Sequence, residues 1–509
     1  MTAQPTKRLA IVLDDRPVPV ERVVDVAVSG VPVTVSRNRR WRRRLAESRA
    51  VLERGLAAGQ AVYGVSTGVG NNSSRGVEAA HQAEFALSVM EQHGCGVGDP
   101  LSPVEGRAIT FARLVSLAKG LSAVRPELIE ALAALLNHGI TPVIPRWGSV
   151  GASGDLTPLS YVAAVVAGRR KAYYRGRIVK AADALGGEGL HPFALGPKEP
   201  LAIMNGTSVM TGLGILVVER FERLLGWVEQ ASALAAEVLL GRSQAFAALV
   251  HDAKPHPGQI ESARRVRQAL RGSRLLDPPP RDGRPVQDRY SIRCVPQAVG
   301  AARDAVIWAR EVLAIELNSV NDNPLVDPDR RQILFGGNFF GGHPALVLDT
   351  LEIAAAAVAD LVERQFALLM DEHHNMGLPE TLVRYPGCGV KGLQVSCSAL
   401  TAQAIQRSFP DSVLSRSTEC ANQDKVSMGV QAALNAGDVV GLLALALATG
   451  LIALSNAARL RDETGISPRG RTLLHVVRAR SPVLEVDRPL DADIARVAAW
   501  LPGGVEDAR

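Results

Sequence analysis

Cysteine is scarce in this chain, which has five among 509 residues. The five are Cys95, Cys294, Cys388, Cys397 and Cys420. They form neither a CxxC pair nor a short-spaced ladder, so the sequence predicts no disulfide framework and no zinc site, and we expect no bound metal. Reduced thiols of this kind are typical of the cytosol.

Apolar runs long enough for a bilayer span are also missing. The first apolar run is five residues long before Asp14 and Asp15 interrupt it, which is too short for the core of a signal peptide. Residues 439–454 are apolar and uncharged, but a bilayer span needs about 20 residues and flanking aromatic side chains. We therefore expect a cytoplasmic protein without a membrane partner, in which residues 439–454 form a buried helix.

The charge balance is only slightly basic, with 57 Lys and Arg against 51 Asp and Glu. Much of the local excess lies in the run RNRRWRRR at residues 37–44. No nucleic-acid-binding motif accompanies this run, and a lone arginine run that opens a helix is usually a solvated face or a subunit contact. We therefore expect no nucleic-acid partner.

Helical signals dominate the chain beyond its first hundred residues. Ser102 and Glu105 form a capping box around Pro103, and a second helix is predicted from Pro126 to Asn137. Long Ala- and Leu-rich stretches follow at residues 207–240, 297–320, 346–371 and 427–461. Stretches longer than a typical globular helix predict a mainly α fold built on a long central bundle.

The N-terminal part is expected to be less regular. Alternating valines within the first 35 residues predict a small hairpin, and the Gly- and Pro-rich residues 139–159 predict a long functional loop. We divide the chain into an N-terminal α+β domain at 1–200, the long-helix bundle at 201–480 and a tail at 481–509.

The tripeptide Ala152-Ser153-Gly154 lies within this loop. A backbone amide can attack the carbonyl two residues back if nothing crowds it, and glycine has no Cβ to do so. A serine between the two can lose its hydroxyl as water, which leaves a double bond conjugated to the new ring. The product is an electrophile, whereas the simpler interpretation of the tripeptide is a turn.

The surrounding motifs favour the first interpretation. In chain order they are VYGVSTGVG (62–70), HGCGVG (93–98), GSVGASGDLTPLS (148–160), IMNGTSVMTG (203–212), QDRYSIRC (287–294), ELNSVNDNPL (316–325), GGNFFGGH (336–343) and STECANQDKVSMG (417–429). This set resembles the histidine and aromatic amino acid ammonia-lyase family. The resemblance implies the ammonia-lyase/fumarase-like fold, a homotetramer whose active sites each take residues from three chains, and the prosthetic group 4-methylidene-imidazol-5-one (MIO), formed from Ala152, Ser153 and Gly154.

The resemblance also implies roles for individual residues. Tyr63 matches the general base for the substrate β-proton, a role that needs a depressed pKa because free tyrosine titrates near ~10. Asn205 matches the amide beside the prosthetic group. Arg293 matches the guanidinium that binds the substrate carboxylate through two parallel hydrogen bonds. Tyr290 and Phe339 match a second tyrosine and an aromatic neighbour of the prosthetic group.

Three further residues match supporting positions of the family: Gln287, Asn323 and Asp155. Each could instead be purely structural. Another alternative is a catalytically inactive scaffold. A Ser153→Ala variant that lost no activity would favour it.

The substrate is indicated by residues near the expected ring pocket. Gln92 and His93 lie where the family carries its ring selectivity, and this pair favours a ring with a polar group, although His93 could also be an ordinary core histidine. Gln423 replaces the glutamate of histidine-type enzymes, which favours tyrosine. Glu419 departs from the usual Asn or Ser and adds a carboxylate near the substrate amine or ring.

The expected reaction is therefore elimination of ammonia from L-tyrosine to give 4-coumarate. The alternatives are a tyrosine 2,3-aminomutase and a histidine ammonia-lyase that forms urocanate. The combination of motifs resembles the branch found in aryl-polyene and other secondary-metabolite pathways. Val69 departs from the usual phenylalanine in the loop that carries Tyr63, and loop mobility decides between lyase and mutase in this family.

Overall fold

The computed structural model describes residues 10–279 and 286–501. The chain forms two compact units, each assembled from three separate stretches. Unit 1 consists of Met1–Leu216, Arg310–Leu348 and Pro410–Leu434, and unit 2 of Val217–Ala309, Asp349–Phe409 and Asn435–Arg509. The domain limits at residues 200 and 480 stay a prediction.

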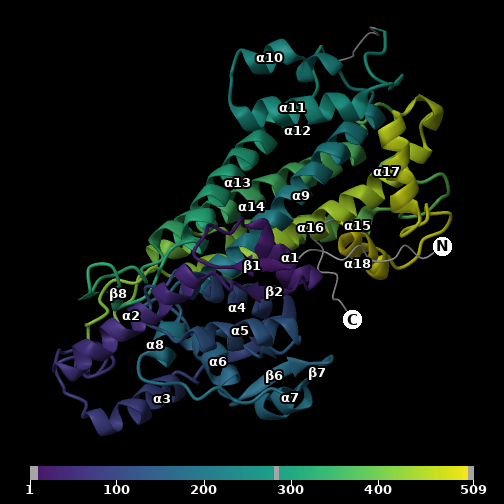
Figure 1. Cartoon of the computed structure of the whole chain (residues 1–509). Coiled ribbons are helices and arrows are strands. Elements are labelled where there is room, and N and C mark those ends of the chain that lie inside the picture. Colours follow the sequence, from purple (N-terminus) through teal and green to yellow (C-terminus); the bar gives the residue numbers. More distant parts are fainter. Residues whose placement is uncertain (1–9, 280–285, 502–509) are drawn as a thin grey trace. The chain divides into compact units, whose positions relative to one another are not determined.

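Unit 1 contains the shorter helices that precede the first long one (Figure 1). They are α1 (Glu21–Ser29), α2 (Arg39–Ala57), α3 (Gln82–Gln92), α4 (Pro103–Ala118), α5 (Pro126–Asn137), α6 (Leu156–Val166), α7 (Ala181–Gly187) and α8 (Glu199–Met204). Helix α4 begins at the predicted capping box: the hydroxyl of Ser102 accepts from the Glu105 amide, and the Glu105 carboxylate accepts from the Ser102 amide. Helices α4 and α5 pack together, as do α6 and α8.

Unit 1 also contains short strands. They are β1 (Ile11–Leu13), β2 (Val33–Val35), β3 (Val97–Pro100), β4 (Thr141–Pro142), β5 (Pro145–Trp147), β6 (Lys171–Tyr174), β7 (Arg177–Lys180), β8 (Leu325–Asp327) and β9 (Gln332–Leu334). Strand β6 lies between β4 and β7, while β3 pairs with β5 and β8 with β9, all antiparallel. Strands β4 and β5 lie within the predicted loop 139–159, and α6 begins before its end.

The predicted N-terminal hairpin is wrong. Strands β1 and β2 pair in parallel, with Ile11 opposite Val33, and α1 forms the crossover between them. Val23, Val26 and Ala27 are buried along one face of α1. The valines follow the three- and four-residue spacing of a helix as well as the alternation of a strand, and parallel pairing requires a crossover rather than a tight turn.

The predicted long helices are confirmed. They are α9 (Ser208–Val238), α13 (Val295–Leu317), α14 (Gly342–Met370) and α16 (Gly429–Arg459), and the limits of the two units fall within them. The mainly α fold built on long helices is therefore confirmed.

Within unit 2, α9, α13 and α14 run side by side (Figure 1), and side-chain contacts join them. Glu229 of α9 pairs with Arg303 of α13, and Ser232 of α9 bonds to Gln365 of α14. Helix α15 (Lys391–Arg407) is joined to α14 by the hydroxyl of Ser398. The remaining helices are α10 (Ala248–Asp252), α11 (Pro257–Leu270), α12 (Tyr290–Arg293), α17 (Pro468–Arg478) and α18 (Asp491–Trp500), the last within the predicted tail.

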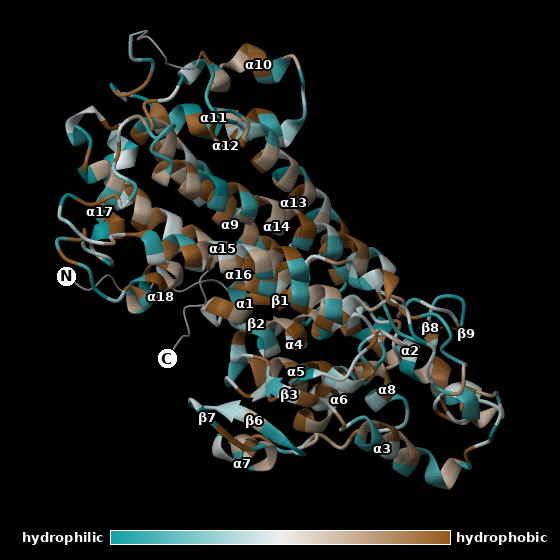
Figure 2. Cartoon of the chain, turned by 180° about the vertical axis from the view of Figure 1, so that it is seen from behind, coloured by the Kyte–Doolittle hydropathy of each residue, from teal (hydrophilic) through white to brown (hydrophobic). Residues whose placement is uncertain are grey.

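Helix α16 contains residues 439–454 and is predominantly hydrophobic (Figure 2). Among the described residues it is the one helix long and apolar enough to cross a membrane, yet 72% of its most apolar window is buried inside the protein. A helix that is apolar on all sides is expected where other helices surround it.

Candidate active site

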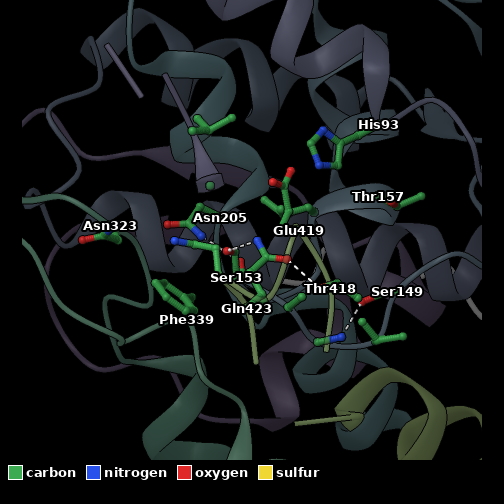
Figure 3. A pocket seen from close by; sticks show the side chains of 18 of the residues that line it. His93, Ser149, Ser153, Thr157, Asn205, Asn323, Phe339, Thr418, Glu419 and Gln423 are labelled. Atoms are coloured by element: carbon green, nitrogen blue, oxygen red, sulfur yellow. Dashed lines mark hydrogen bonds between the residues drawn. The ribbon is translucent and has the colours of Figure 1, made fainter. Parts of the chain in front are cut away.

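Unit 1 contains a cavity of about 410 Å³ lined by the tripeptide loop. The lining comes from residues 148–154 and 418–419, from residues 422–425, and from several single side chains that include Tyr63, His93 and Asn205. In Figure 3, Ser153 lies between Asn205 and Gln423, with Glu419 and His93 on one side of it and Phe339 on the other. The cavity thus brings together most of the predicted site residues.

Ser153 is held by two side-chain amides. The Asn205 amide donates to its carbonyl oxygen at 2.7 Å, and Gln423 Nε2 donates to its hydroxyl at 3.1 Å. Gln423 is oriented by Thr418, whose hydroxyl donates to Gln423 Oε1 at 2.8 Å. Ser153 also has a positive φ of 53°, a conformation that costs a non-glycine residue about 1 kcal/mol or more.

Gly154 lies directly against the backbone of Gly206. Its φ is 78°, and a Cβ built on it would lie 2.3 Å from the carbonyl oxygen of Gly206. The same carbonyl oxygen accepts a hydrogen bond of 2.7 Å from the Asp155 amide. The backbone on both sides of Gly154 is therefore fixed, and only glycine fits.

Asp155 follows the tripeptide and is fully buried. Its Oδ2 accepts hydrogen bonds from the amides of Val209 (2.8 Å) and Met210 (3.1 Å) in the first turn of α9. Burial raises the pKa of this carboxyl to about 7, against the opposing effect of those two amides. Asp155 thus anchors the tripeptide loop to the N-terminus of a long helix.

Tyr63 and Glu419 are held by neighbouring backbone amides. The Gly70 amide donates to the Tyr63 hydroxyl oxygen at 2.8 Å, and the Asn71 amide donates to Glu419 Oε2 at 3.4 Å. Burial raises the pKa of Tyr63 above its ordinary value, the Gly70 amide opposes this, and the Glu419 carboxylate adds to it. The expected depressed pKa is therefore not found in this chain, because the amide is outweighed by burial.

Glu419 begins an unusual turn. Glu419, Cys420 and Ala421 all have positive φ, at 52°, 52° and 64°. Thr418 and Gln423 close this turn by backbone hydrogen bonds in both directions. Three non-glycine residues in this conformation are held in place only by surrounding contacts.

His93 lines the cavity, whereas Gln92 is exposed and does not. The ring Nδ1 of His93 lies 2.8 Å from the carbonyl oxygen of Val89. A carbonyl can only accept, so Nδ1 carries the proton and Nε2 of a neutral ring remains an acceptor. His93 is therefore suited to a ligand group that donates a hydrogen bond.

Phe339 and Asn323 line the same cavity. Asn323 Oδ1 accepts a hydrogen bond of 2.9 Å from the Gly336 amide, at the start of the loop that carries Phe339. Through this contact Asn323 helps to hold the loop that carries Phe339.

Three predicted site residues belong to unit 2: Gln287, Tyr290 and Arg293. The Arg293 guanidinium lies 4.6 Å from the centre of the Tyr290 ring and donates to Gln287. Tyr290 is 71% exposed. These three residues form a local group of their own on and beside α12.

Sequence reasoning missed several residues that shape the cavity. Thr418 orients Gln423, and Gly70 and Gly206 supply backbone groups to Tyr63 and to the tripeptide loop. All three lie within the quoted motifs. The contacts of Gly70 and Gly206 run through the backbone, which leaves no signal in the side-chain type, whereas Thr418 acts through its hydroxyl.

Comparison with known proteins identifies the family. The model of the aromatic amino acid lyase family matches residues 18–479, which is most of the chain. The chain therefore belongs to the aromatic amino acid lyase family and is an enzyme of carbon–nitrogen lyase chemistry, the class of ammonia-lyases and related aminomutases.

Relatives with different substrates are similarly close. The chain is 38% identical to the histidine ammonia-lyase of Gloeobacter violaceus, covering 97% of this chain and 96% of the relative. It is also 38% identical to the tyrosine ammonia-lyase of Cereibacter sphaeroides, covering 96% of each. The crystal structure of a tyrosine aminomutase from Streptomyces globisporus matches with a TM-score of 0.91, 38% identity and 97% coverage of both chains. These similarities establish the class without distinguishing among its substrates.

Proposed function

We propose that this enzyme eliminates ammonia from L-tyrosine to give 4-coumarate, using MIO formed from Ala152, Ser153 and Gly154. The observation that carries the proposal is the conformation of the tripeptide. Ser153 has a positive φ and accepts hydrogen bonds at its carbonyl oxygen from Asn205 and at its hydroxyl from Gln423. Gly154 has no room for a Cβ.

The residues around the tripeptide fit this prosthetic group. Asn205 Oδ1 is buried without a hydrogen-bond partner in the described chain, although the Nδ2 atom of the same amide is bonded to Ser153. Asn205 and Gln423 would hold the group from two sides. When present, MIO would supply an electrophile for the substrate amine, which would make the nitrogen a better leaving group.

Tyr63 is the proposed base for the β-proton, and Glu419 the partner of the substrate ammonium. In the free chain, both burial and the Glu419 carboxylate raise the Tyr63 pKa. An ammonium beside Glu419 neutralises the second of these causes, and the Gly70 amide stabilises the phenolate. Substrate binding thereby favours the deprotonated form of Tyr63.

His93 is the proposed partner of the tyrosine ring. Its Nε2 is an acceptor, which matches a phenol hydroxyl and has no counterpart on phenylalanine. Gln92 is exposed, so its contribution to selectivity is proposed to be indirect.

Arg293 is proposed to bind the substrate carboxylate, and Tyr290 to assist beside it. Arg293 Nε is buried without a hydrogen-bond partner among the described residues, which leaves a donor for an incoming oxygen. Both residues lie in unit 2, whereas the cavity belongs to unit 1. We propose a homotetramer, as the resemblance to the family implies, in which Arg293 and Tyr290 of one chain complete the cavity of another.

Two alternatives remain from the class. A tyrosine 2,3-aminomutase is favoured by the similarity to the Streptomyces globisporus structure. A histidine ammonia-lyase is favoured by the similarity to several curated relatives, but Gln423 bonds to Ser153 and offers no carboxylate for an imidazole.

Mass spectrometry of the products distinguishes these functions. The purified enzyme and its Ser153→Ala variant are incubated separately with L-tyrosine, L-phenylalanine and L-histidine. We expect a Ser153-dependent loss of ammonia from tyrosine. An isomer of unchanged mass would establish the aminomutase, and urocanate from histidine would establish the second alternative. No Ser153-dependent turnover of any of the three would contradict the proposal.

A further inference from the structure

Arg113 is a fully buried arginine in the middle of α4, a helix that does not carry any of the proposed site residues. Its exposed fraction is 0%, and burial lowers its pKa to about 10, which still leaves it charged at neutral pH. A buried charge is costly unless its hydrogen bonds are satisfied, so the contacts of this guanidinium are informative.

The guanidinium donates in two directions. Nε and Nη2 both donate to the carbonyl oxygen of Ala202 near the C-terminal end of α8, the first at 3.0 Å. Nη1 donates to Asn321 Oδ1 at 2.7 Å. That same amide oxygen accepts from the Thr207 amide at 3.3 Å. Arg113 thus holds the backbone before Asn205 directly and the backbone after Gly206 through Asn321.

The segment between Ala202 and Thr207 is the one that makes hydrogen bonds to the tripeptide loop. Asn205 donates to the carbonyl oxygen of Ser153, and the Gly206 carbonyl accepts from the Asp155 amide. The fit is tight, because a Cβ at Gly206 would lie 2.1 Å from Arg113 Nη1 and 2.3 Å from Asn321 Oδ1. A displacement of Arg113 would therefore move the contacts on both sides of Gly154.

A second buried cation supports the same region. Lys198 precedes α8 and pairs with Asp322, both with fully buried side chains, and the Asp322 carboxylate also accepts from the Asn323 amide at 2.7 Å. Lys198 therefore fixes the chain next to Asn321 and the start of α8, and its ion pair is to Asp322 rather than to residues 205–207. Lys198 is therefore a general supporting residue, whereas Arg113 acts on the segment that contacts the tripeptide.

We propose that Arg113 is a positioning residue for ring formation: with Asn321, it holds Asn205 and Gly206 so that the Gly154 nitrogen stays directed at the Ala152 carbonyl. This inference rests on the proposed function. In that step a bond forms between the Gly154 nitrogen and the Ala152 carbonyl carbon. The carbonyl oxygen leaves as water with the amide protons of Ser153 and Gly154. The Ser153 hydroxyl and its Cα hydrogen leave as the second water, and no oxidant is required.

The test measures ring formation by intact mass, independently of catalysis. Cultures expressing the full chain are pulse-labelled, and the fraction of purified protein that has lost two water molecules is followed with time. The variants are Arg113→Lys and Asn321→Ala. The matched control is Arg107→Met, since Arg107 lies on the same helix but donates to the carbonyl of Ala27 instead. Circular dichroism and thermal unfolding establish that each variant is folded.

We expect folded Arg113→Lys and Asn321→Ala to lose the two waters at least roughly tenfold more slowly than the wild type, and Arg107→Met to match the wild type. A lysine has one compact ammonium group, so it cannot bond to Ala202 and Asn321 at the same time as the planar guanidinium of Arg113 does. Folded variants that mature at the wild-type rate would overturn the proposal. If neither variant folds, Arg113 serves folding rather than positioning, which also overturns it. A wild-type chain that never loses two waters would instead contradict the proposed function itself.

Discussion

The side-chain amide of Asn205 donates a hydrogen bond of 2.7 Å to the carbonyl oxygen of Ser153. That carbonyl becomes part of the proposed ring, so the Asn205 contact acts on charge that develops there. We expect Asn205→Ala to lower kcat roughly a hundredfold, in the range found for the loss of one preorganised donor, with a smaller change in KM. Steady-state absorbance of the arylacrylate measures both constants.

Asn137→Ala is the control for this change. The Asn137 amide bonds to the backbone of Val33 in both directions and does not line the cavity. Equal losses of kcat in the two variants would mean that Asn205→Ala acts by destabilising the fold, not by removing the contact to Ser153.

Gly154→Ala is expected to abolish ring formation. The added methyl would lie 2.3 Å from the Gly206 carbonyl oxygen, a backbone atom that cannot move aside without breaking its bond to the Asp155 amide. Gly176→Ala is matched in conformation, with φ of 72° against 78°, but its Cβ would meet nothing within 4 Å. Intact mass should therefore show two water losses in Gly176→Ala and none in Gly154→Ala, whereas ring formation in both would refute the steric argument.

His93→Leu should shift the substrate preference toward phenylalanine. The substitution removes the Nε2 acceptor while it retains an apolar side chain at the cavity wall. We expect the ratio of kcat/KM for tyrosine over phenylalanine to fall about 10- to 100-fold, the value of one lost polar contact. Gln92→Leu, on an exposed neighbour, should leave this ratio nearly unchanged. An unchanged kcat/KM ratio in His93→Leu would show that His93 does not contribute to the selectivity for the substrate ring.

Glu419→Gln should move the pH profile of kcat/KM. The Glu419 carboxylate is one cause of the raised Tyr63 pKa, so its removal lowers that pKa and shifts the rising limb of the profile to lower pH. KM for the amino acid should rise because the proposed ammonium partner is lost. Glu84→Gln, on an exposed residue of α3, is the control. A limb that shifts to higher pH would rule out the electrostatic coupling between Glu419 and Tyr63.

Asp155 predicts a pH-dependent stability. Its pKa in the folded chain is about 7, above the value near ~4 of an unfolded aspartate. The folded state therefore binds the proton more tightly, and this contribution is complete below about pH 4 and lost as the pH rises through about 7. It amounts to at most about 4 kcal/mol in the free energy of unfolding.

Urea denaturation at several pH values tests this contribution in the wild type and in Asp155→Asn. An asparagine oxygen still accepts from the Val209 and Met210 amides but does not titrate. The decline in the free energy of unfolding between about pH 4 and pH 7 should be smaller in the variant. Identical declines would mean that Asp155 is ionised throughout.

Much of the fold could be predicted because the long helices carry strong local signals. The Ala- and Leu-rich periodicity predicted α9, α13, α14 and α16 to within a few residues, and the capping box predicted the first residue of α4. The N-terminal hairpin failed because Val26 fits two patterns, the alternation with Val28 that is typical of a strand and the helix face that it shares with Val23. Local pattern could not decide between the two, and tertiary contacts did.

The grouping of the candidate site was predictable where a motif contains the side chain that lines the cavity, and unpredictable where the contact comes through the backbone. The tripeptide and its neighbours Tyr63, Asn205 and Gln423 lie together in the cavity. Arg113 gave no signal, because an arginine within a helix is ordinarily solvated. Residue type also did not predict that Tyr290 and Arg293 belong to unit 2.

The division of unit 1 into three stretches has a consequence for synthesis on the ribosome. The tripeptide is made early, but Asn321 follows Arg113 by 208 positions and Gln423 follows Ser153 by 270. A nascent chain that has not yet emerged as far as Gln423 lacks the donor to the Ser153 hydroxyl. The electrophile is therefore expected to form only when most of the chain has left the ribosome, so that a stalled or truncated product carries an unreactive serine.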